Sequence, residues 1–122
     1  MDKKSVLLAD DDELLASLLN FRLRKGGYEV HHSSNGKEVK EYLKTSMPDI
    51  IVSDIMMPYF SGIELISYVR KDLNSNIPII IISSAGNEEN VLSAFEMGAN
   101  DFISKPVSPS ELIVRLAREL NK

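Results

Sequence analysis

The sequence predicts an α/β domain with a parallel sheet of five strands and helices on both of its faces. Short apolar runs alternate five times with longer segments of helical spacing, an order typical of parallel sheets with helical crossovers. Three of the runs are continuously apolar, as expected for strands that helices cover on both faces. The length of 122 residues fits one domain over residues 1–122.

The first half of the chain predicts three strands and two helices. Val6–Ala9 is short, apolar and bounded by charge, which indicates a buried strand. Leucines at helical spacing then run up to Gly26 and Gly27, a glycine stop signal for a helix. Two histidines weaken the apolar pattern of the next strand. The predicted strands are Val6–Ala9, Tyr28–Ser33 and Ile50–Val52, and the two helices run from Leu14 up to Gly26 and from Gly36 to about Lys44.

The second half predicts two more strands and three helices. A helix beginning at Gly62 has an apolar stripe that ends at Leu73. A helix from Asn87 to Met97 is expected to point its apolar side chains inward and to end at Gly98. The last helix begins at Pro109, a first-turn position that suits proline. The inward side chains expected in the Asn87–Met97 helix are Val91, Leu92 and Phe95, and the two strands are Ile79–Ile82 and Phe102–Ile103.

Right-handed crossovers leave few ways to arrange such units. We expect the doubly wound, flavodoxin-like strand order 2-1-3-4-5 with five helices. In that order a crevice opens between the first and third strands at their carboxyl ends. The functional residues are therefore expected at the carboxyl ends of the strands.

Composition and charge exclude several classes of function. The 14 basic and 18 acidic residues give a net charge of −4, which argues against direct nucleic-acid binding. The absence of cysteine excludes disulfides, thiolate metal sites and cysteine nucleophiles. Apolar runs of four residues are far short of the about 20 that a membrane span needs. We expect a cytoplasmic protein without membrane association.

Polar residues follow the predicted strands at the expected edge. Asp10 and Asp11 follow the first strand, Asp54 follows the third, Ser83 the fourth and Lys105 the fifth. Carboxylates grouped without His or Cys favour Mg²⁺, which keeps open positions for phosphoryl oxygens. A carboxylate can itself attack phosphorus, and Mg²⁺ and a lysine can offset the charge of the transferred group. The arrangement predicts phosphoryl chemistry.

Four segments of the chain, in order, resemble the receiver (CheY-like) domain of two-component response regulators. The resemblance covers essentially the whole chain. Each segment is weak alone, but the four together at consistent spacing are highly specific. The segments are Ser5–Asp12, Pro48–Pro58, Pro78–Ser84 and Gly98–Pro106.

The resemblance implies a role for each of these residues. It implies Asp54 as the phosphoacceptor, paired with Lys105, and a cis bond between Lys105 and Pro106. Mg²⁺ would be bound directly by Asp11 and largely through water by Asp10. Asp54 and the backbone carbonyl of Met56 would complete the metal site. Ser83 would contact the phosphoryl group, and Phe102 would change rotamer on activation. The phosphodonor would be a sensor histidine kinase or a histidine phosphotransfer protein. The domain would be a switch that catalyses its own phosphorylation and dephosphorylation, not a classical enzyme.

The chain departs from the common pattern of the family at four positions. Ser83 replaces the commoner Thr and Phe102 the commoner Tyr, so a methyl and a phenolic hydroxyl are lost. Tyr59 and Ser61 stand where Gly and Asp are frequent, in the loop after Pro58. None of these changes removes a required group.

Other functions fit less well. A small-molecule aspartyl-phosphate hydrolase would have an acid where Met56 stands, and a flavin carrier would not place three acids at its phosphate loop. A degenerate receiver that acts only as a protein-interaction module is the main alternative. His31 and His32 are expected on the edge strand, far from the crevice and without a role.

The output of the switch is implied by the resemblance alone. The fourth helix, fifth strand and fifth helix would form the output face and a candidate homodimer interface. Asp101 and Arg115 are expected to pair there, whereas the fourth helix offers no basic partner for Glu111. Residues 105–112 resemble receivers attached to winged-helix DNA-binding domains. The sequence leaves open whether the chain acts alone or belongs to a longer regulator.

Overall fold

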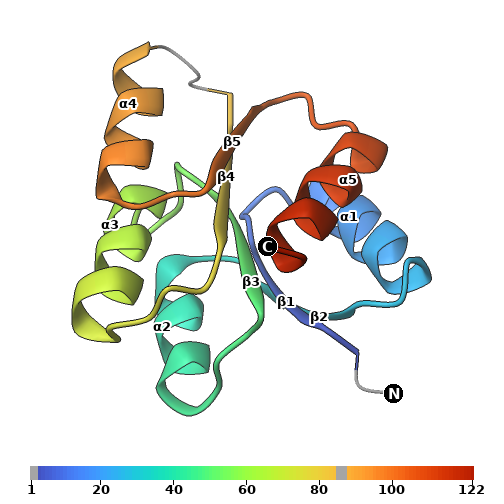
Figure 1. The fold of residues 1–122 in the computed structure, drawn as a ribbon, viewed down its shortest axis with the longest axis horizontal. Coiled ribbons are helices and arrows are strands. Elements are labelled where there is room, and N and C mark those ends of the chain that lie inside the picture. The colour runs from blue at the N-terminus through green and yellow to red at the C-terminus, as the bar shows by residue number, and fades with distance from the viewer. Residues whose placement is uncertain (1–2, 85–87) are drawn as a thin grey trace.

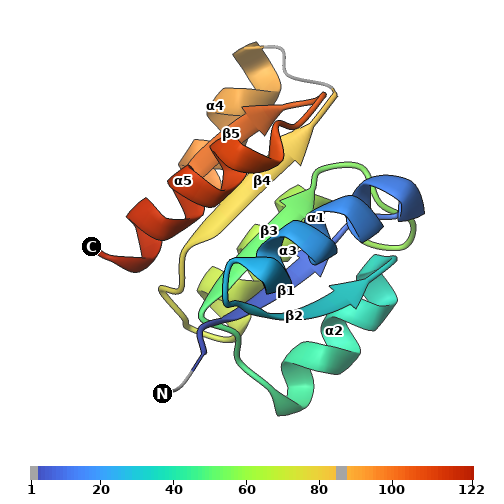
Figure 2. The ribbon, with the colours of Figure 1, turned by 90° about the vertical axis from the view of Figure 1, so that its right-hand side faces the viewer.

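The computed structural model of the chain describes residues 3–84 and 88–122 and contains a five-stranded parallel sheet between two layers of helices (Figures 1 and 2). The strand order β2-β1-β3-β4-β5 confirms the predicted fold. The strands are β1 (Ser5–Ala9), β2 (Glu29–Ser33), β3 (Ile50–Asp54), β4 (Ile79–Ser83) and β5 (Asp101–Ser104). The helices are α1 (Glu13–Lys25), α2 (Gly36–Thr45), α3 (Gly62–Ser67), α4 (Glu88–Met97) and α5 (Pro109–Leu120).

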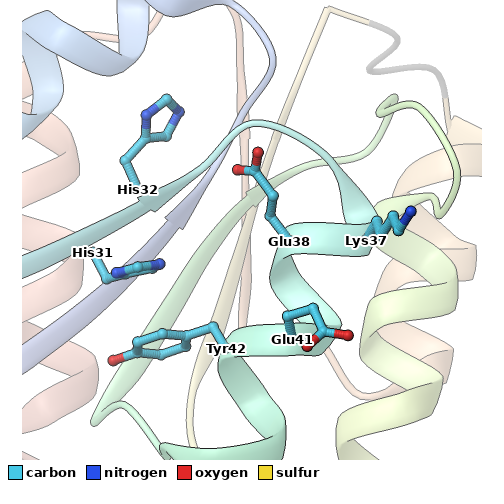
Figure 3. A pocket seen from close by; sticks show the side chains of 6 residues that line it. All are labelled: His31, His32, Lys37, Glu38, Glu41 and Tyr42. Carbon is cyan, nitrogen blue, oxygen red and sulfur yellow. The ribbon is translucent and has the colours of Figure 1, made fainter.

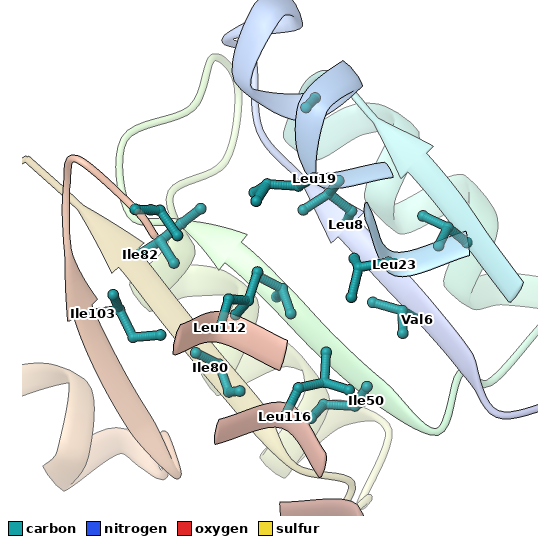
Figure 4. Packing of buried hydrophobic residues seen from close by; sticks show 14 residues of the cluster. Val6, Leu8, Leu19, Leu23, Ile50, Ile80, Ile82, Ile103, Leu112 and Leu116 are labelled. Atoms are coloured by element: carbon teal, nitrogen blue, oxygen red, sulfur yellow. The ribbon is translucent and has the colours of Figure 1, made fainter. Parts of the chain in front are cut away.

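Two cores lie on opposite faces of the sheet because successive strand residues point to opposite sides. Helices α1 and α5 cover one face, and α2, α3 and α4 cover the other (Figure 1). Leu8 packs in the α1–α5 core (Figure 4), whereas its neighbour Leu7 packs in the other. The central strands β3 and β4 are buried along their whole length. This double burial is the reason that their sequences are continuously apolar.

Local signals define the ends of the helices. Asp12 caps α1 by accepting a hydrogen bond from the Leu15 N–H. Gly27 and Gly98 follow α1 and α4 with φ values of +95° and +117°, in the region that favours glycine. No helix in the described part of the chain has the length and apolar character that spanning a membrane requires.

Helical spacing was a poorer guide to which side chains are buried. Leu92 and Phe95 of α4 are 52% and 44% exposed, so the prediction that they point inward is wrong, and Ala94 is the buried residue of that turn. In α1, Leu14 and Leu18 are exposed although they continue the leucine spacing. The predicted start of the fourth helix at Asn87 lies outside the described residues.

The helix that begins at Gly62 ends differently from its prediction. Its last turn, Tyr68–Asp72, is π-helical. Arg70 of this turn donates hydrogen bonds to the backbone oxygens of Gly98, Ser75 and Ile77. It thereby ties the turn to the loops that precede β4 and β5.

Two pairs of residues close the amino edge of the sheet. Asp49 accepts hydrogen bonds from the backbone N–H of Ser5 at 2.7 Å and from its hydroxyl at 3.2 Å. Asn100 accepts from the Ile79 N–H through its side chain at 2.9 Å and donates its own N–H to the Ile79 oxygen at 2.8 Å. Both pairs join segments that lie far apart in the chain.

Candidate functional site

Polar side chains from four strand ends gather at the carboxyl edge of the sheet. The register pairs Ala9 with Ser53 and Asp54 with Ile82, so the strands end at nearly the same level. The residues at these ends are Asp10 and Asp11 after β1, Asp54 at the end of β3, Ser83 at the end of β4 and Lys105 after β5. The edge is therefore the one that the sequence predicts.

Three carboxylates form an acidic cluster at this edge. Asp10, Asp11 and Asp54 each offer an oxygen, and these oxygens lie within 4.8 Å of one another. Asp10 is fully buried and Asp54 is 5% exposed, whereas Asp11 is exposed. Burial raises the pKa of Asp10, and the charge of Asp54 adds to the rise although the Asp12 N–H and Lys105 oppose it. Repulsion and burial together make this cluster costly to keep charged.

Lys105 brings a positive charge to the cluster. Its Nζ lies 2.9 Å from Oδ2 of Asp54 and 3.4 Å from Oδ2 of Asp10. Burial lowers the pKa of Lys105, but the hydrogen bond to Asp54 and the two carboxylate charges outweigh burial and raise it. Lys105 therefore stays protonated over the physiological range. The Lys105–Pro106 bond is cis, as the resemblance implies.

The backbone around Asp54 is closely packed. The Met56 N–H donates to Oδ1 of Asp54 at 3.2 Å. Gly62, the first residue of α3, lies against the same strand end: a Cβ at this position would stand 2.6 Å from the Asp54 carbonyl oxygen. Only glycine lets α3 begin this close to the strand. Helix α3 thus supports the Asp54 backbone from behind.

One buried oxygen of the cluster is left without a hydrogen bond. Oδ1 of Asp10 accepts the Asp12 N–H at 2.8 Å, but among the described residues Oδ2 has no hydrogen-bond partner. A buried carboxylate oxygen in that state is a ready ligand for a cation. The donor set consists of carboxylate oxygens without His or Cys, which fits a hard cation such as Mg²⁺.

The other predicted site residues lie around the cluster. Ser83 is fully buried at the end of β4, and its backbone oxygen accepts the Lys105 N–H at 2.8 Å. Phe102 is partly buried on β5 and packs against the core beneath α2, α3 and α4. Met56 is 66% exposed beside Asp54. The structure thus brings Asp10, Asp11, Asp54 and Lys105 together, with Ser83 on the adjacent strand.

Two residues near the site were not predicted to matter. His32 was expected to lie far from the crevice, and this is wrong: its Nε2 lies 2.9 Å from the backbone oxygen of Asp10. Tyr59, in the loop after Asp54, has φ +72°, a left-handed value that is costly for a residue other than glycine. The common Gly at this position in the family was the available signal for Tyr59, whereas spacing along the chain gave none for His32.

Comparisons with known proteins agree with this geometry. A family model described as the response regulator receiver domain matches residues 6–117. The phosphate regulon transcriptional regulatory protein PhoB of Pseudomonas aeruginosa is 36% identical over 120 residues, which are 98% of this chain and 52% of that protein. The alkaline phosphatase synthesis transcriptional regulatory protein PhoP of Bacillus subtilis is 34% identical over 119 residues, which are 98% of this chain and 49% of that protein. The chain spans about half the length of these curated relatives.

Solved structures match over nearly the whole chain. The receiver domain of the Francisella response regulator 1452 superposes with a TM-score of 0.92 at 35% identity, and the match covers 98% of each chain. The chemotaxis response regulator CheY4 of Vibrio cholerae superposes with a TM-score of 0.89 at 27% identity, over 97% of this chain and 99% of that one.

Proposed function

Because the chain belongs to the family of response regulator receiver domains, we propose that it is a phosphoacceptor with Asp54 as the residue that takes the phosphoryl group. Members of this family act as phosphoacceptor switches and not as classical enzymes. The observation that carries the assignment is the contact of 2.9 Å between Asp54 and Lys105, inside a cluster of three carboxylates. Asp54 lies at the end of β3, the middle strand of the sheet.

In the proposed reaction, a carboxylate oxygen of Asp54 attacks the phosphorus of a phosphohistidine. A new O–P bond forms as the N–P bond breaks, and the departing imidazole nitrogen keeps the electron pair of that bond and takes up a proton. Asp54 is held for this attack through its backbone by β3 and through Oδ1 by the Met56 N–H. The remaining oxygen, Oδ2, faces Lys105. Hydrolysis by water returns the free carboxylate, so the domain would also dephosphorylate itself.

Lys105 and Ser83 are proposed to stabilise the transferred group. Lys105 already neutralises Asp54, and it can turn to an oxygen of the phosphoryl group without leaving its place after β5. The hydroxyl of Ser83, on the strand next to Asp54, would donate a hydrogen bond to another phosphoryl oxygen. Fixed charges and donors of this kind, placed where negative charge develops, are a main source of catalysis in phosphoryl transfer.

The cofactor would be Mg²⁺, held by Asp11, Asp54 and the backbone carbonyl of Met56, with Asp10 acting largely through water. When bound, Mg²⁺ would offset the negative charge of the carboxylates and of the incoming phosphoryl oxygens. Oδ2 of Asp10, which has the ion pair with Lys105 at 3.4 Å but no hydrogen bond among the described residues, supports a cation at this place. Without one, the acidic cluster has Lys105 as the cation paired with it in the described part of the chain.

The phosphodonor would be a sensor histidine kinase or a histidine phosphotransfer protein in the cytoplasm. Exposed apolar side chains at the site support a protein donor, because Leu14 and Leu18 of α1 are 84% and 48% exposed. Leu18 also lines a groove with Lys105, Pro106 and Val107. We propose no direct nucleic-acid binding by this chain. Its curated relatives are called transcriptional regulatory proteins, and they are about twice its length.

The output face would consist of α4, β5 and α5, with Ser83 and Phe102 coupling it to Asp54. The predicted pair on this face is present, since Arg115 lies 3.0 Å from Asp101. Arg118 contacts the same carboxylate at 3.3 Å, and Glu111 lies 3.7 Å from Arg115 of its own helix. A homodimer through this face would have to exchange these pairs within the chain for pairs between chains.

Intact mass after incubation with a small phosphoryl donor and Mg²⁺ tests the proposal. One phosphoryl adduct is expected, dependent on Mg²⁺ and absent from Asp54→Asn. An adduct that persists in Asp54→Asn would overturn the assignment of Asp54. A wild-type chain that stays unmodified with both the small donor and phosphohistidine proteins would favour the interaction module that works without phosphorylation.

A further inference from the structure

His32 lies on β2, the edge strand of the sheet, beside a pocket that faces α2. Figure 3 shows that His31 and Tyr42 lie together in this pocket, with ring centroids 4.1 Å apart. The ring of His32 points away from that pair (Figure 3). Its Nε2 lies 2.9 Å from the backbone oxygen of Asp10. Two adjacent histidines therefore have different surroundings, and one of them contacts the acidic cluster through its backbone.

The contact is a hydrogen bond donated by the histidine. A carbonyl oxygen only accepts, so Nε2 of His32 must carry the hydrogen. The next residue of β2, Ser33, accepts the Asp10 N–H at 3.1 Å. Two consecutive residues of β2 thus hold both backbone polar groups of Asp10. The β1–β2 ladder ends at the pair Ala9–Ser33, and His32 extends the pairing one residue further through its side chain.

Fixing the Asp10 carbonyl fixes the start of Asp11. The carbonyl of Asp10 and the N–H of Asp11 belong to one planar peptide group. A hydrogen bond to the carbonyl therefore restrains the direction in which Asp11 leaves the strand. Asp11 is exposed, and no hydrogen bond to its carboxylate is found among the described residues. Its place within 4.8 Å of the other two carboxylates thus depends on its backbone.

We propose that His32 is a positioning residue for the magnesium site. By donating Nε2–H to the Asp10 carbonyl, it holds the peptide from which the Asp11 carboxylate reaches the cluster. The inference rests on the proposed function, because it assigns Mg²⁺ to that cluster. It adds a residue from the edge strand, which contacts a ligand's backbone and not the ion.

Titration of the full chain with Mg²⁺ alone, followed by isothermal calorimetry, tests the inference. His32→Ala is expected to weaken Mg²⁺ binding by about tenfold, as is usual when a supporting partner of a metal ligand is lost. His32→Gln places an amide N–H where Nε2 lies and is expected to bind within about twofold of the wild type. His32→Asn is too short for this donation and should resemble Ala. His31→Ala is the matched control and should bind as the wild type does.

A second measurement observes the contact without metal. In the metal-free protein, the Asp10 carbonyl ¹³C and Asp11 ¹⁵N resonances should shift in His32→Ala and His32→Asn and stay near their wild-type positions in His32→Gln. Circular dichroism checks that each variant folds. If His32→Ala fails to fold, the comparison of His32→Gln with His32→Asn tests the positioning role.

The outcomes separate this inference from the proposed function. Unchanged Mg²⁺ affinity in His32→Ala and His32→Asn overturns the positioning role, and so does an equal loss in His31→Ala or in His32→Gln. A wild-type chain that binds no Mg²⁺ overturns it as well. If the wild-type chain forms no phosphoryl adduct but the His32 variants lose Mg²⁺ affinity in the expected order, the positioning role stands and the assignment of Asp54 as phosphoacceptor is overturned.

Discussion

Carboxylates lie at both edges of the sheet, and their surroundings differ. At the amino edge, Asp49 accepts two hydrogen bonds from Ser5. At the carboxyl edge, Asp10 and Asp54 crowd one another around Lys105, and one oxygen of Asp10 has no hydrogen-bond partner among the described residues. The carboxylate at the amino edge is hydrogen-bonded by its own chain, whereas two carboxylates at the other edge share one lysine. The difference indicates that Asp49 stabilises the fold, whereas the cluster at the carboxyl edge is suited to bind the proposed Mg²⁺.

The sharpest test of this contrast removes one carboxylate from each edge of the sheet. Asp54→Ala should abolish the phosphoryl adduct seen by intact mass and change stability little, since it also relieves repulsion with Asp10. Asp49→Ala should leave the adduct intact and lower the free energy of unfolding by about 1–3 kcal/mol, because two hydrogen bonds to a charged acceptor are lost. Denaturant unfolding beside mass spectrometry checks both. A strongly destabilised Asp54→Ala would contradict the contrast.

The second prediction removes the cation of the carboxyl edge. Lys105→Met should lower the free energy of unfolding by about 1–3 kcal/mol at pH 7, because two buried carboxylates lose their partner. The raised pKa of Lys105 means that its contribution is present below pH 10.5 and is lost as pH rises through the higher folded value. The control is Lys44→Met, whose ion pair with Glu41 is exposed and should matter little. Equal melting temperatures for the two variants would show that Lys105 does not stabilise the cluster.

The third prediction removes a charge from the acidic cluster. Without metal, Asp10→Asn should raise the free energy of unfolding by about 1–2 kcal/mol at pH 7, because burial of the Asp10 charge costs more than its contacts with Lys105 and the Asp12 N–H return. Burial raises the pKa of Asp10 above 3.8, so above that pH the unfolded chain releases this proton first. Stability of the wild type therefore falls as pH rises from 3.8 through the folded pKa. Unfolding measured over a pH series should show the advantage of Asp10→Asn growing across that window and vanishing below it. An advantage that is independent of pH would assign the effect to packing.

The smallest effect concerns backbone conformation at the two edges. Tyr59, in the loop after Asp54, has φ +72°, whereas Asn74, in the loop before β4, has φ +50°. Tyr59→Gly should raise the free energy of unfolding by about 0.5–1 kcal/mol, since the left-handed strain exceeds the entropy cost of glycine. Asn74→Gly should change it less, because asparagine tolerates this region. Thermal melting of both variants checks the order, and a larger gain at Asn74 would reverse it.

The fold and the acidic cluster were predictable because both depend on patterns along single segments. Apolar runs with polar residues at their carboxyl ends define the strands and place Asp10, Asp54 and Lys105 at one edge. The resemblance then gave these residues their roles. The pairing of Asp101 with Arg115 was likewise implied by the resemblance, and the structure contains it.

Other features depend on contacts that a linear pattern does not contain. The apolar spacing of α4 includes Leu92 and Phe95, but Ala94 is the buried residue of that turn and the two larger residues are exposed. His32 of β2 contacts the backbone oxygen of Asp10 on the neighbouring strand. Because every residue has such an oxygen, the residue types do not predict this contact. The π-helical turn likewise contains Arg70, which donates to backbone oxygens of two other segments, the loops before β4 and β5.

Strand β4 contains four consecutive isoleucines, buried on both faces. Identical side chains specify register weakly, because a shift by one residue would place isoleucine again at three of the four positions. Packing of the isoleucines alone therefore does little to fix the register of β4 against its neighbouring strands. The reciprocal hydrogen bonds between Ile79 and Asn100, at the amino end of β4, help to fix this register. Ser83 thus reaches the level of Asp54 because an asparagine at the far edge of the sheet sets where the strand begins.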